Sequence, residues 1–310
     1  MFGNFSIGVV TYLARYELYF RPLINKLHLL FPDYDINVWI NGHHDRKRQV
    51  DYLRKVTSFL NKYQNVRYLV NYEHQPLASG FNRLILMAQN NRVLILNDDV
   101  KLLLNFRHNI ENLPSPAEIF TLNGAWSHFV ISKNVVKKVG WFDERLLGIG
   151  YEDTDYAIRL ALNGIPLGNI RVHGLHDCMA PPEDATWADI SELTLDKYSR
   201  INWEFFQKKW GVINPGEDPQ GDALRIQAVG VEWRLRPDAS LQETPEYYPR
   251  SCLDYSSDYE AKMGKKLRGQ MARAGSLIAS LCWQARLWGG EQLQKFLGPR
   301  WEQWRKTWGR

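Results

Sequence analysis

Two adjacent carboxylates follow a short apolar segment of the chain. Residues 92–96 read RVLIL and run directly into Asn97, Asp98 and Asp99. Carboxylates at the end of a buried strand are costly unless something neutralises their charge. A divalent cation such as Mg²⁺ or Mn²⁺ does so, and it combines a few protein carboxylates with the phosphate oxygens of a substrate. The segment therefore predicts either a metal–diphosphate site or a plain turn, because Asn and Asp are common where strands end.

A second group of acids, Glu152, Asp153 and Asp155, stands at the start of a predicted helix, after Gly148 and Gly150. The helix dipole favours negative charge there by about 0.3–1 kcal/mol per group, which explains part of the pattern as helix capping. Three acids exceed what capping needs, and the glycines let the backbone approach a ligand closely. A carboxylate in this place can take a proton from an acceptor hydroxyl as a general base.

Four other side chains are candidates by type and position. His173 and His176 follow the acidic helix, and imidazole together with carboxylates suits Mn²⁺, although a surface position explains them equally. Arg83 begins a predicted helix near the expected ligand pocket, where it contacts the ligand or lies on the surface. Trp126 either stacks on the face of a sugar or packs in the core.

The pattern of apolar segments indicates the fold that positions these residues. Strands are expected at residues 5–12, 36–40, 66–70 and 92–96, with helices at 17–30, 45–63 and 81–89 between them. Such alternation predicts an α/β fold with a mostly parallel sheet and helices on both faces. Ligands bind beyond the carboxyl ends of the strands in sheets of this kind. Thr11, Asn41 and Asn97 stand at three of those ends.

The rest of the chain is less regular. Short strands are expected at residues 119–122, 128–131 and 169–175, and helices at 134–139 and 152–162. Prolines are spread through residues 180–260, which predicts an irregular subdomain wrapped on the main one. The expected division is therefore a main domain at residues 1–179, the irregular subdomain at 180–260 and a tail at 261–310.

Three segments, in order along the chain, resemble the motifs of one enzyme family. They are Asn97-Asp98-Asp99, Gly140-Trp141-Phe142-Asp143-Glu144 and Glu152-Asp153-Thr154-Asp155, the last followed by Arg159 and Gly164. This order is similar to that of the inverting family-2 glycosyltransferases of GT-A fold, over roughly residues 5–178. The last segment also resembles the Gly-rich acidic stretch of β-1,4-galactosyltransferases. The resemblance implies a Rossmann-like GT-A domain that binds a nucleotide-sugar and catalyses sugar transfer.

The resemblance also implies a role for each matching residue. Asp99 binds the metal, Mn²⁺ or Mg²⁺, that bridges the diphosphate, with His176 or His173 as a further ligand. Asp153 is the base that deprotonates the acceptor, and Glu152 places the acceptor or the donor sugar. The donor is held by Asp98 at the ribose and by Thr11 and Asn41 at the base, with Asn97 beside the metal ligand. The family motifs do not include Arg83 or Trp126, and their contacts, with the base or diphosphate and with the sugar, are expected from position and residue type alone. Positions 41 and 97, where Asp is common in that family, are both Asn here.

Residues 261–310 form a basic tail rich in tryptophan. They hold 11 Lys and Arg against 2 Glu, a net charge of +9, so the rest of the chain carries −4 of the overall +5. Five of the 12 tryptophans lie between Trp283 and Trp308. A basic amphipathic helix lies in the membrane interface, and anionic lipids attract each basic residue by about 1 kcal/mol. The amphipathic helical tail therefore predicts peripheral attachment to an anionic membrane surface, with docking on its own domain or in an oligomer as the alternative.

The composition narrows the class of protein. Hydrophobic residues at 45% and charged residues at 24% are typical of a folded domain, and the acidic balance outside the tail argues against a nucleic-acid partner. No apolar run reaches the roughly 18 residues that a membrane-spanning helix needs, and the N-terminal sequence predicts a strand, not a signal peptide. Three widely spaced cysteines, Cys178, Cys252 and Cys282, fit the reducing cytoplasm.

Together these features predict a metal-dependent, inverting glycosyltransferase of the hexosyltransferase type, at the cytoplasmic face of the cell membrane. It moves a single sugar from a nucleotide-sugar, expected to be a UDP-sugar, to a hydroxyl of a glycan or lipid-linked saccharide in cell-surface polysaccharide synthesis. A nucleotidyltransferase or retaining glycosyltransferase on a similar fold is one alternative, although residues 9–13 lack the Gly-rich, basic loop of nucleotidyltransferases. A non-catalytic carbohydrate- or membrane-binding module is the other.

Overall fold

The computed structural model describes residues 5–12, 15–42, 46–72, 74–113, 117–177, 196–214, 217–218 and 221–242. The chain divides into one unit at Met1–Ser257 and a second at Asp258–Arg310, and every described residue belongs to the first. The predicted tail at residues 261–310, its membrane contact and all three cysteines therefore lie outside the described residues. Within the described ranges, no helix is long and apolar enough to cross a membrane.

A seven-stranded sheet forms the centre of this unit, in the order β3-β2-β1-β4-β7-β6-β8. Its strands are β1 (Phe5–Thr11), β2 (Ile36–Ile40), β3 (Val66–Val70), β4 (Arg92–Asn97), β6 (Ile119–Leu122), β7 (Ala125–Ser132) and β8 (Gly168–Ile170). The first four are parallel, as are β6 and β8, whereas β7 runs antiparallel to both of its neighbours. β1 and β2 are buried along their whole length, as expected of parallel strands covered on both faces. The predicted α/β fold with a mostly parallel sheet is confirmed.

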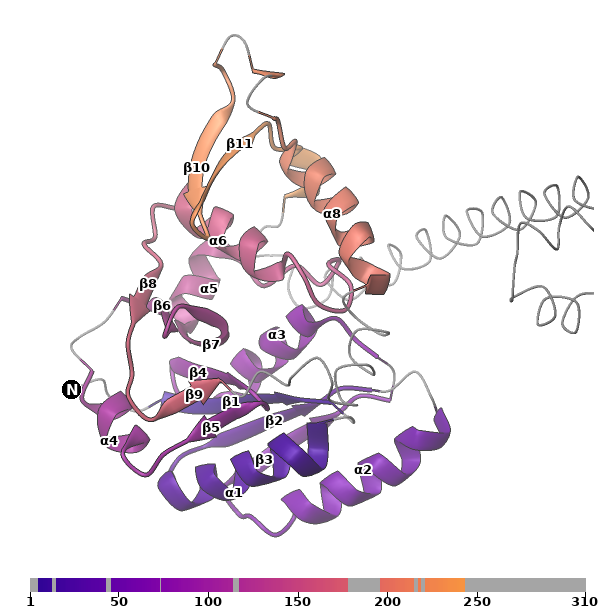
Figure 1. Ribbon diagram of the computed structural model, residues 1–310, viewed down its shortest axis with the longest axis vertical. Helices are drawn as coiled ribbons and strands as arrows, with labels where there is room; N and C mark the ends of the chain where they lie inside the picture. The colour runs from indigo at the N-terminus through magenta and orange to yellow at the C-terminus, as the bar shows by residue number, and fades with distance from the viewer. Residues whose placement is uncertain are drawn as a thin grey trace, which may run out of the picture. The chain divides into compact units, whose positions relative to one another are not determined.

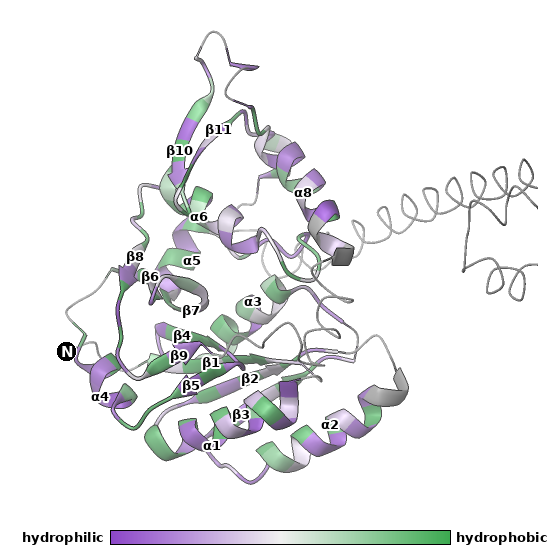
Figure 2. Cartoon of the chain, in the orientation of Figure 1, coloured by the Kyte–Doolittle hydropathy of each residue, from purple (hydrophilic) through white to green (hydrophobic). Residues whose placement is uncertain are grey.

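Helices cover both faces of the sheet. α1 (Arg21–Leu30), α2 (Arg46–Leu60) and α4 (Phe106–Glu111) share one apolar core with alternate residues of β1, β2 and β4. α3 (Leu77–Met87), α5 (Lys133–Val139) and α6 (Glu152–Leu162) share a second core with the residues between those. Figure 1 places α1 and α2 on one side of the sheet and α3 on the other, and Figure 2 shows polar and apolar bands along α1 and α2. The sheet is thus the middle layer of three, with its carboxyl edge left for a ligand.

Residues 17–30, predicted as one helix, form a short π-helix at Tyr16–Phe20 followed by α1. The change falls between Phe20 and Arg21, and Pro22 stands in the first turn of α1, where proline is tolerated because the first N–H groups of a helix have no partner within it. The buried side chains of α1 then follow helical spacing: Leu23, Ile24, Leu27 and Leu30.

The single strand predicted at residues 169–175 is wrong, because the chain forms two strands there in two different sheets. β8 ends at Ile170, and β9 (Leu175–Asp177) pairs antiparallel with β5 (Val100–Leu102). Between them Gly174 adopts a φ of +89°, and a Cβ there would lie 2.5 Å from the side chain of Asn105. This turn carries the chain from the edge of the large sheet to the residues that directly follow Asp99.

Part of the region predicted as irregular is regular in the structure. It contains α8 (Asp196–Trp210), a hairpin of β10 (Leu224–Ala228) and β11 (Val231–Leu235), and a 3-10 helix at Ala239–Leu241. α8 and the hairpin share a third apolar core with α6, formed around Phe206, Trp210 and Ile158. The proposed boundaries at residues 179 and 260 stay predictions.

A buried charge cluster joins α8 to the start of α6. Lys209 contacts Asp143 at 2.7 Å and Asp155 at 2.6 Å, and the three side chains are fully buried. Arg145 binds Asp143 at 2.6 Å, and Arg159 binds Asp155 at 2.9 Å. Burial alone would raise the pKa of Asp143, but Lys209 and Arg145 hold that pKa well below its usual range. The cluster therefore anchors both ends of the segment that carries Gly148, Gly150 and the acids of α6.

Replacement of Lys209 by Met should destabilise the protein, because it leaves Asp143 and Asp155 buried with less positive charge. The expected loss in free energy of unfolding is about 3–5 kcal/mol, measured by denaturant unfolding. Lys208→Met is the matched control, since Lys208 is exposed in the same turn of α8 and its loss should change stability by less than about 0.5 kcal/mol. Equal stability of the two variants would contradict an anchoring role for the cluster.

Candidate functional site

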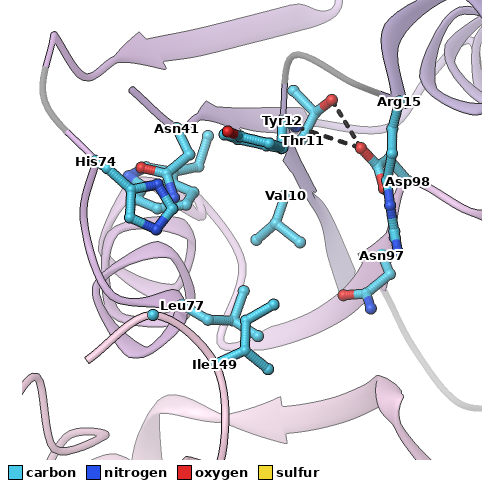
Figure 3. A pocket seen from close by; sticks show the side chains of 12 residues that line it. Val10, Thr11, Tyr12, Arg15, Asn41, His74, Leu77, Asn97, Asp98 and Ile149 are labelled. Carbon is cyan, nitrogen blue, oxygen red and sulfur yellow. Dashed lines mark hydrogen bonds and ion pairs between the residues drawn. The ribbon is translucent and has the colours of Figure 1, made fainter. Parts of the chain in front are cut away.

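A pocket opens at the carboxyl ends of β1, β2 and β4, where ligands bind in parallel sheets. Its lining residues come from those three strand ends, from the start of α3 and the residues before it, and from residues 147–150 before α6, which we call the glycine segment. They are Val10, Thr11, Tyr12, Arg15, Trp39, Asn41, His74, Leu77, Asn97, Asp98, Gly148 and Ile149. Figure 3 shows Arg15, Asn97 and Asp98 on one side of it and Asn41 and His74 on the other. The structure thus brings together the predicted residues Thr11, Asn41, Asn97 and Asp98.

The polar side of the pocket is built around Asp98. Thr11 donates its hydroxyl hydrogen to Oδ2 of Asp98 at 2.9 Å, and Arg15 donates to Oδ1 at 3.1 Å. The Asp98 residue is 2% exposed, and burial raises the pKa of its carboxyl despite the neighbouring guanidinium. Asp98 is therefore held rigidly by the end of β1 and by the residue that begins the next helical segment.

Asp99 is the less satisfied of the two carboxylates. Its Oδ2 lies 2.8 Å from Arg15, whereas its Oδ1 is buried and has no hydrogen-bond partner. Burial, Asp98 and Asp177 raise the pKa of Asp99 to about 6, against the lowering effect of Arg15. A buried oxygen without a partner at this place needs a proton, a solvent molecule or a cation.

The residues around Asp99 fit a divalent cation in part. Two adjacent carboxylates, one with a free oxygen, are the hard ligands that Mg²⁺ and Mn²⁺ accept, and such cations commonly complete their shell with water and substrate phosphates. Among the described residues, no group of three or more His, Cys, Asp or Glu side chains is arranged to hold a metal ion. The protein alone therefore offers an incomplete shell, which a diphosphate would complete.

The two predicted histidine ligands lie on a neighbouring segment. His173 is exposed in the turn before β9, and its carbonyl oxygen accepts a hydrogen bond from Asn109 at 2.9 Å. His176 is exposed in β9, opposite Lys101 of β5. The residue opposite Val100 is Asp177, and because successive side chains of a strand point to opposite faces, His176 and Asp177 diverge. Asp177 is the one that acts on the pKa of Asp99.

The other side of the pocket is aromatic. The rings of Tyr12 and His74 meet edge to face with centroids 5.8 Å apart, and Trp39, almost fully buried, is also among the lining residues. Asn41 lines this wall, but its side-chain oxygen accepts from the backbone of Gln75 at 2.9 Å and its amide donates back to Gln75 at 2.9 Å. Asn41 therefore fixes the segment that carries His74.

The glycine segment closes the pocket opposite the sheet. The carbonyl of Gly148 accepts from the backbone N–H of Leu77 at 2.8 Å, and Asn202 of α8 bonds both N–H and C=O of Leu147, at 2.8 and 2.7 Å. Gly148 has a φ of +60°, and a Cβ there would lie 2.6 Å from the ring of Tyr198. Position 148 therefore needs glycine, and residues of α3 and α8 hold the segment beside the pocket.

The two predicted catalytic acids begin α6, directly after this segment. Glu152 is 7% exposed and accepts from the N–H of Gly150 at 2.5 Å. Burial and the neighbouring Asp153 raise the pKa of Glu152 to about 8, so it is protonated at neutral pH. Asp153 is half-buried, and its carboxylate accepts from the N–H of Thr154 at 2.6 Å. Asp155, by contrast, belongs to the buried charge cluster, so its role is structural.

Two other predicted ligand-binding residues are not among those that line the pocket. Arg83 lies half-buried in α3. Trp126 packs against Phe129, Phe142 and Tyr156, with ring centroids 5.3–6.5 Å apart, and lines a separate cavity beside α6. Trp126 is therefore half-buried against two apolar cores, and its contact with a sugar stays a prediction.

Several residues of the site were missed by sequence reasoning. Arg15 follows β1 by only a few positions, just past the segment searched for a basic residue, and its signal was a cation after a strand end. Asp177 carried no signal beyond following His176 in the chain, and only the pairing of β5 with β9 shows that it lies opposite Val100. Tyr12, Trp39 and His74 carried no signal, because aromatic residues near strands are usual in cores.

Comparisons with known proteins give distant likenesses only. No protein-family model and no curated protein matches the chain. A mannosyltransferase of Pyrobaculum calidifontis, solved with GDP-mannose and Mn²⁺, is 13% identical over 55% of this chain and 56% of its own, with a TM-score of 0.40. Residues 1–349 of TarS from S. aureus are 15% identical over 66% of this chain and 71% of their own, with a TM-score of 0.41. A mycobacterial protein is 12% identical over 80% and 88%, with a TM-score of 0.43.

These likenesses are too weak to carry any conclusion about this chain. The chain spans little more than half of the mannosyltransferase, 56% of its length. What this chain binds has to be inferred from its own residues.

The raised pKa of Glu152 predicts a pH-dependent effect on stability. Between its ordinary value of 4.5 and about 8, the folded protein holds a proton that the unfolded chain releases, so this carboxyl makes the protein less stable as pH rises. Gln does not titrate. Glu152→Gln should therefore raise the Tm above that of the natural protein at pH 8 and leave it nearly equal at pH 4.5.

The exposed Glu17 provides the control, since Glu17→Gln should change the Tm little at either pH. A Tm difference for Glu152→Gln that is the same at both pH values would show that Glu152 does not hold the extra proton.

Proposed function

We propose that this protein is a metal-dependent glycosyltransferase that uses a nucleotide-sugar donor. The observation that carries the proposal is the buried pair Asp98 and Asp99 at the end of β4, with one carboxylate oxygen unpartnered, beside a pocket with an aromatic wall. A nucleoside diphosphate has the two matching parts, a planar base and an anionic group that carries a cation. Glu152 and Asp153 of α6 follow the segment that closes this pocket. They supply the hydrogen-bond donor and the base that sugar transfer needs in addition.

The pocket suits the base and ribose of the donor. Its volume of about 100 Å³ is smaller than the roughly 300–1,000 Å³ of whole-ligand pockets, so the diphosphate and sugar extend over its rim. In this arrangement Tyr12, Trp39 and His74 contact the base, and Thr11 and Asp98 contact the ribose. Arg83 and Trp126 are not among the lining residues, so the proposal gives them no contact with the donor.

The diphosphate is proposed to lie at Asp99. A bound Mn²⁺ or Mg²⁺ would act there as a Lewis acid and stabilise the negative charge that develops on the leaving nucleoside diphosphate. Asp99 would hold the cation through its unpartnered oxygen, with Asp98 beside it and Asp177 adding negative charge. Asp177 acts on the pKa of Asp99 and neither His173 nor His176 does, so Asp177 is the better candidate for a further ligand.

The acids of α6 divide the chemistry between them. Glu152 keeps its proton at neutral pH and can donate a hydrogen bond to a sugar hydroxyl, which leaves Asp153 as the base. Asp153 takes the proton of the acceptor hydroxyl, and the acceptor oxygen forms a bond to the anomeric carbon. The bond from that carbon to the diphosphate breaks on the opposite side, and the nucleoside diphosphate leaves with the electron pair. The configuration is inverted.

The finer parts of the proposal rest on the sequence. They are a UDP-sugar as donor, a glycan or lipid-linked saccharide as acceptor, transfer of one sugar at a time in cell-surface polysaccharide synthesis, and attachment of residues 261–310 to the inner face of the cell membrane. The tail supports the last of these by its net charge of +9 and its tryptophans.

The donor site predicts a metal-dependent shift of the Tm in a screen of UDP, GDP, CDP and dTDP, each with and without Mn²⁺. A ligand that binds only the folded state stabilises it by about 2.7 kcal/mol at a hundredfold excess over its Kd. One nucleotide should raise the Tm, and only when Mn²⁺ is present. No shift with any of the four would contradict the proposed function.

Asp153→Asn should abolish transfer while donor binding is kept. Loss of a general base lowers the rate by a factor of about 10²–10⁴, whereas the pocket at β1, β2 and β4 is untouched. The two measurements are the turnover of a nucleotide-sugar that carries the nucleotide identified in the screen, and the Tm shift that this nucleotide causes with Mn²⁺. Asp51→Asn, on the exposed face of α2, is the control and should retain full activity. Transfer by Asp153→Asn at the natural rate would exclude Asp153 as the base.

A further inference from the structure

We propose that Arg15 occupies the cation position at Asp98 and Asp99 in the ligand-free protein, and that it must leave Asp99 before a divalent cation binds there. The inference rests on the proposed function, since it concerns the same site. It makes Arg15 a positioning residue that couples the arrival of the cation to that of the donor.

The geometry shows one guanidinium group bridging two carboxylates. Arg15 contacts Asp98 at 3.1 Å and Asp99 at 2.8 Å, and both bonds come from the same nitrogen, Nη1. The three side chains are 15%, 3% and 10% exposed, so water screens the contacts poorly. A single cationic atom group between two carboxylates is the arrangement that a metal ion would otherwise provide.

The charges in this place do not balance. Arg15 contributes one positive charge against two negative ones, and Asp177 adds to the excess because it raises the pKa of Asp99. In the charge cluster of α6 and α8, three cations meet two carboxylates, so that cluster has no need of a ligand. The shortage of positive charge at Asp98 and Asp99 is therefore specific to this site, and a divalent ion would remove it.

Arg15 and a divalent ion cannot both sit against Asp99. Their positive charges would repel each other within a few ångströms, in surroundings from which water is largely excluded. Nε of Arg15 is buried and makes no hydrogen bond, so the two carboxylates account for the contacts found for its guanidinium. A diphosphate brings the negative charge that a displaced guanidinium needs, and Arg binds phosphate oxygens well. Cation and diphosphate should consequently bind together more tightly than either binds alone.

The test is the binding of Mn²⁺ alone to the whole chain, measured from the EPR signal of free Mn²⁺. Arg15→Gln removes the competing charge and should bind Mn²⁺ more tightly than the natural protein by at least about tenfold, equivalent to about 1.4 kcal/mol. Arg15→Lys keeps the charge and should bind like the natural protein. Arg21→Gln removes an exposed arginine of α1 and is the matched control, which should also bind like the natural protein.

A second measurement, the Tm with and without Mn²⁺, allows for a lower stability of Arg15→Gln, in which two buried carboxylates lose their partner. Mn²⁺ should raise the Tm of Arg15→Gln more than that of the natural protein, because the ion restores the missing charge. A purely structural role of Arg15 would instead weaken Mn²⁺ binding in both Arg15 variants.

The outcomes separate this inference from the proposed function. If the natural protein takes up Mn²⁺ with a nucleotide but Arg15→Gln binds Mn²⁺ alone no more tightly, only the role of Arg15 is overturned. If neither protein binds Mn²⁺ under any condition, the cation site itself is overturned, and the proposed function with it.

Discussion

A carboxylate removed from water needs a compensating charge, and the interior of this protein is arranged around that requirement. The requirement is met in full where Lys209, Arg145 and Arg159 surround Asp143 and Asp155. It is met only in part where Arg15 alone faces Asp98 and Asp99. The two clusters contain the same types of side chain but differ in how much positive charge faces the carboxylates. Three cations compensate two carboxylates in the first cluster, whereas one cation faces two carboxylates in the second, next to the pocket.

The charge cluster around Lys209 also helps to explain how segments far apart in the sequence come together at the pocket. Lys209 and Asn202 lie on α8, some fifty residues after the glycine segment that they hold, and Leu77 of α3 holds the same segment from the other side. With these contacts the backbone at Gly148 and Ile149 becomes a wall of a pocket whose floor is the edge of the sheet. The acids at the start of α6 are placed by the same contacts, because they follow directly in the chain.

Within that frame, burial separates the roles of similar side chains. Glu152 and Asp153 are adjacent acids at one helix start, yet the deeper one keeps its proton to about pH 8 and the other faces partly outward. Asp98 and Asp99 are adjacent as well, but Thr11 satisfies the first, while the second keeps a free oxygen. Neighbours in sequence therefore differ in protonation or hydrogen bonding because their surroundings differ.

The sequence by itself determined the α/β class, the strands at 36–40, 66–70 and 119–122 and the helix at 152–162, because apolar periodicity and strand-end residues are local signals. It also placed Thr11, Asn41, Asn97 and Asp98 at strand ends, which is enough to predict that they gather at one edge of the sheet. Only the tertiary structure decided that Arg15 bridges Asp98 and Asp99, that Asp177 rather than His176 acts on Asp99, and that Trp126 lies outside the lining of the pocket. These depend on the pairing of β5 with β9 and on the packing of α8, contacts between residues far apart in the chain that no local pattern encodes.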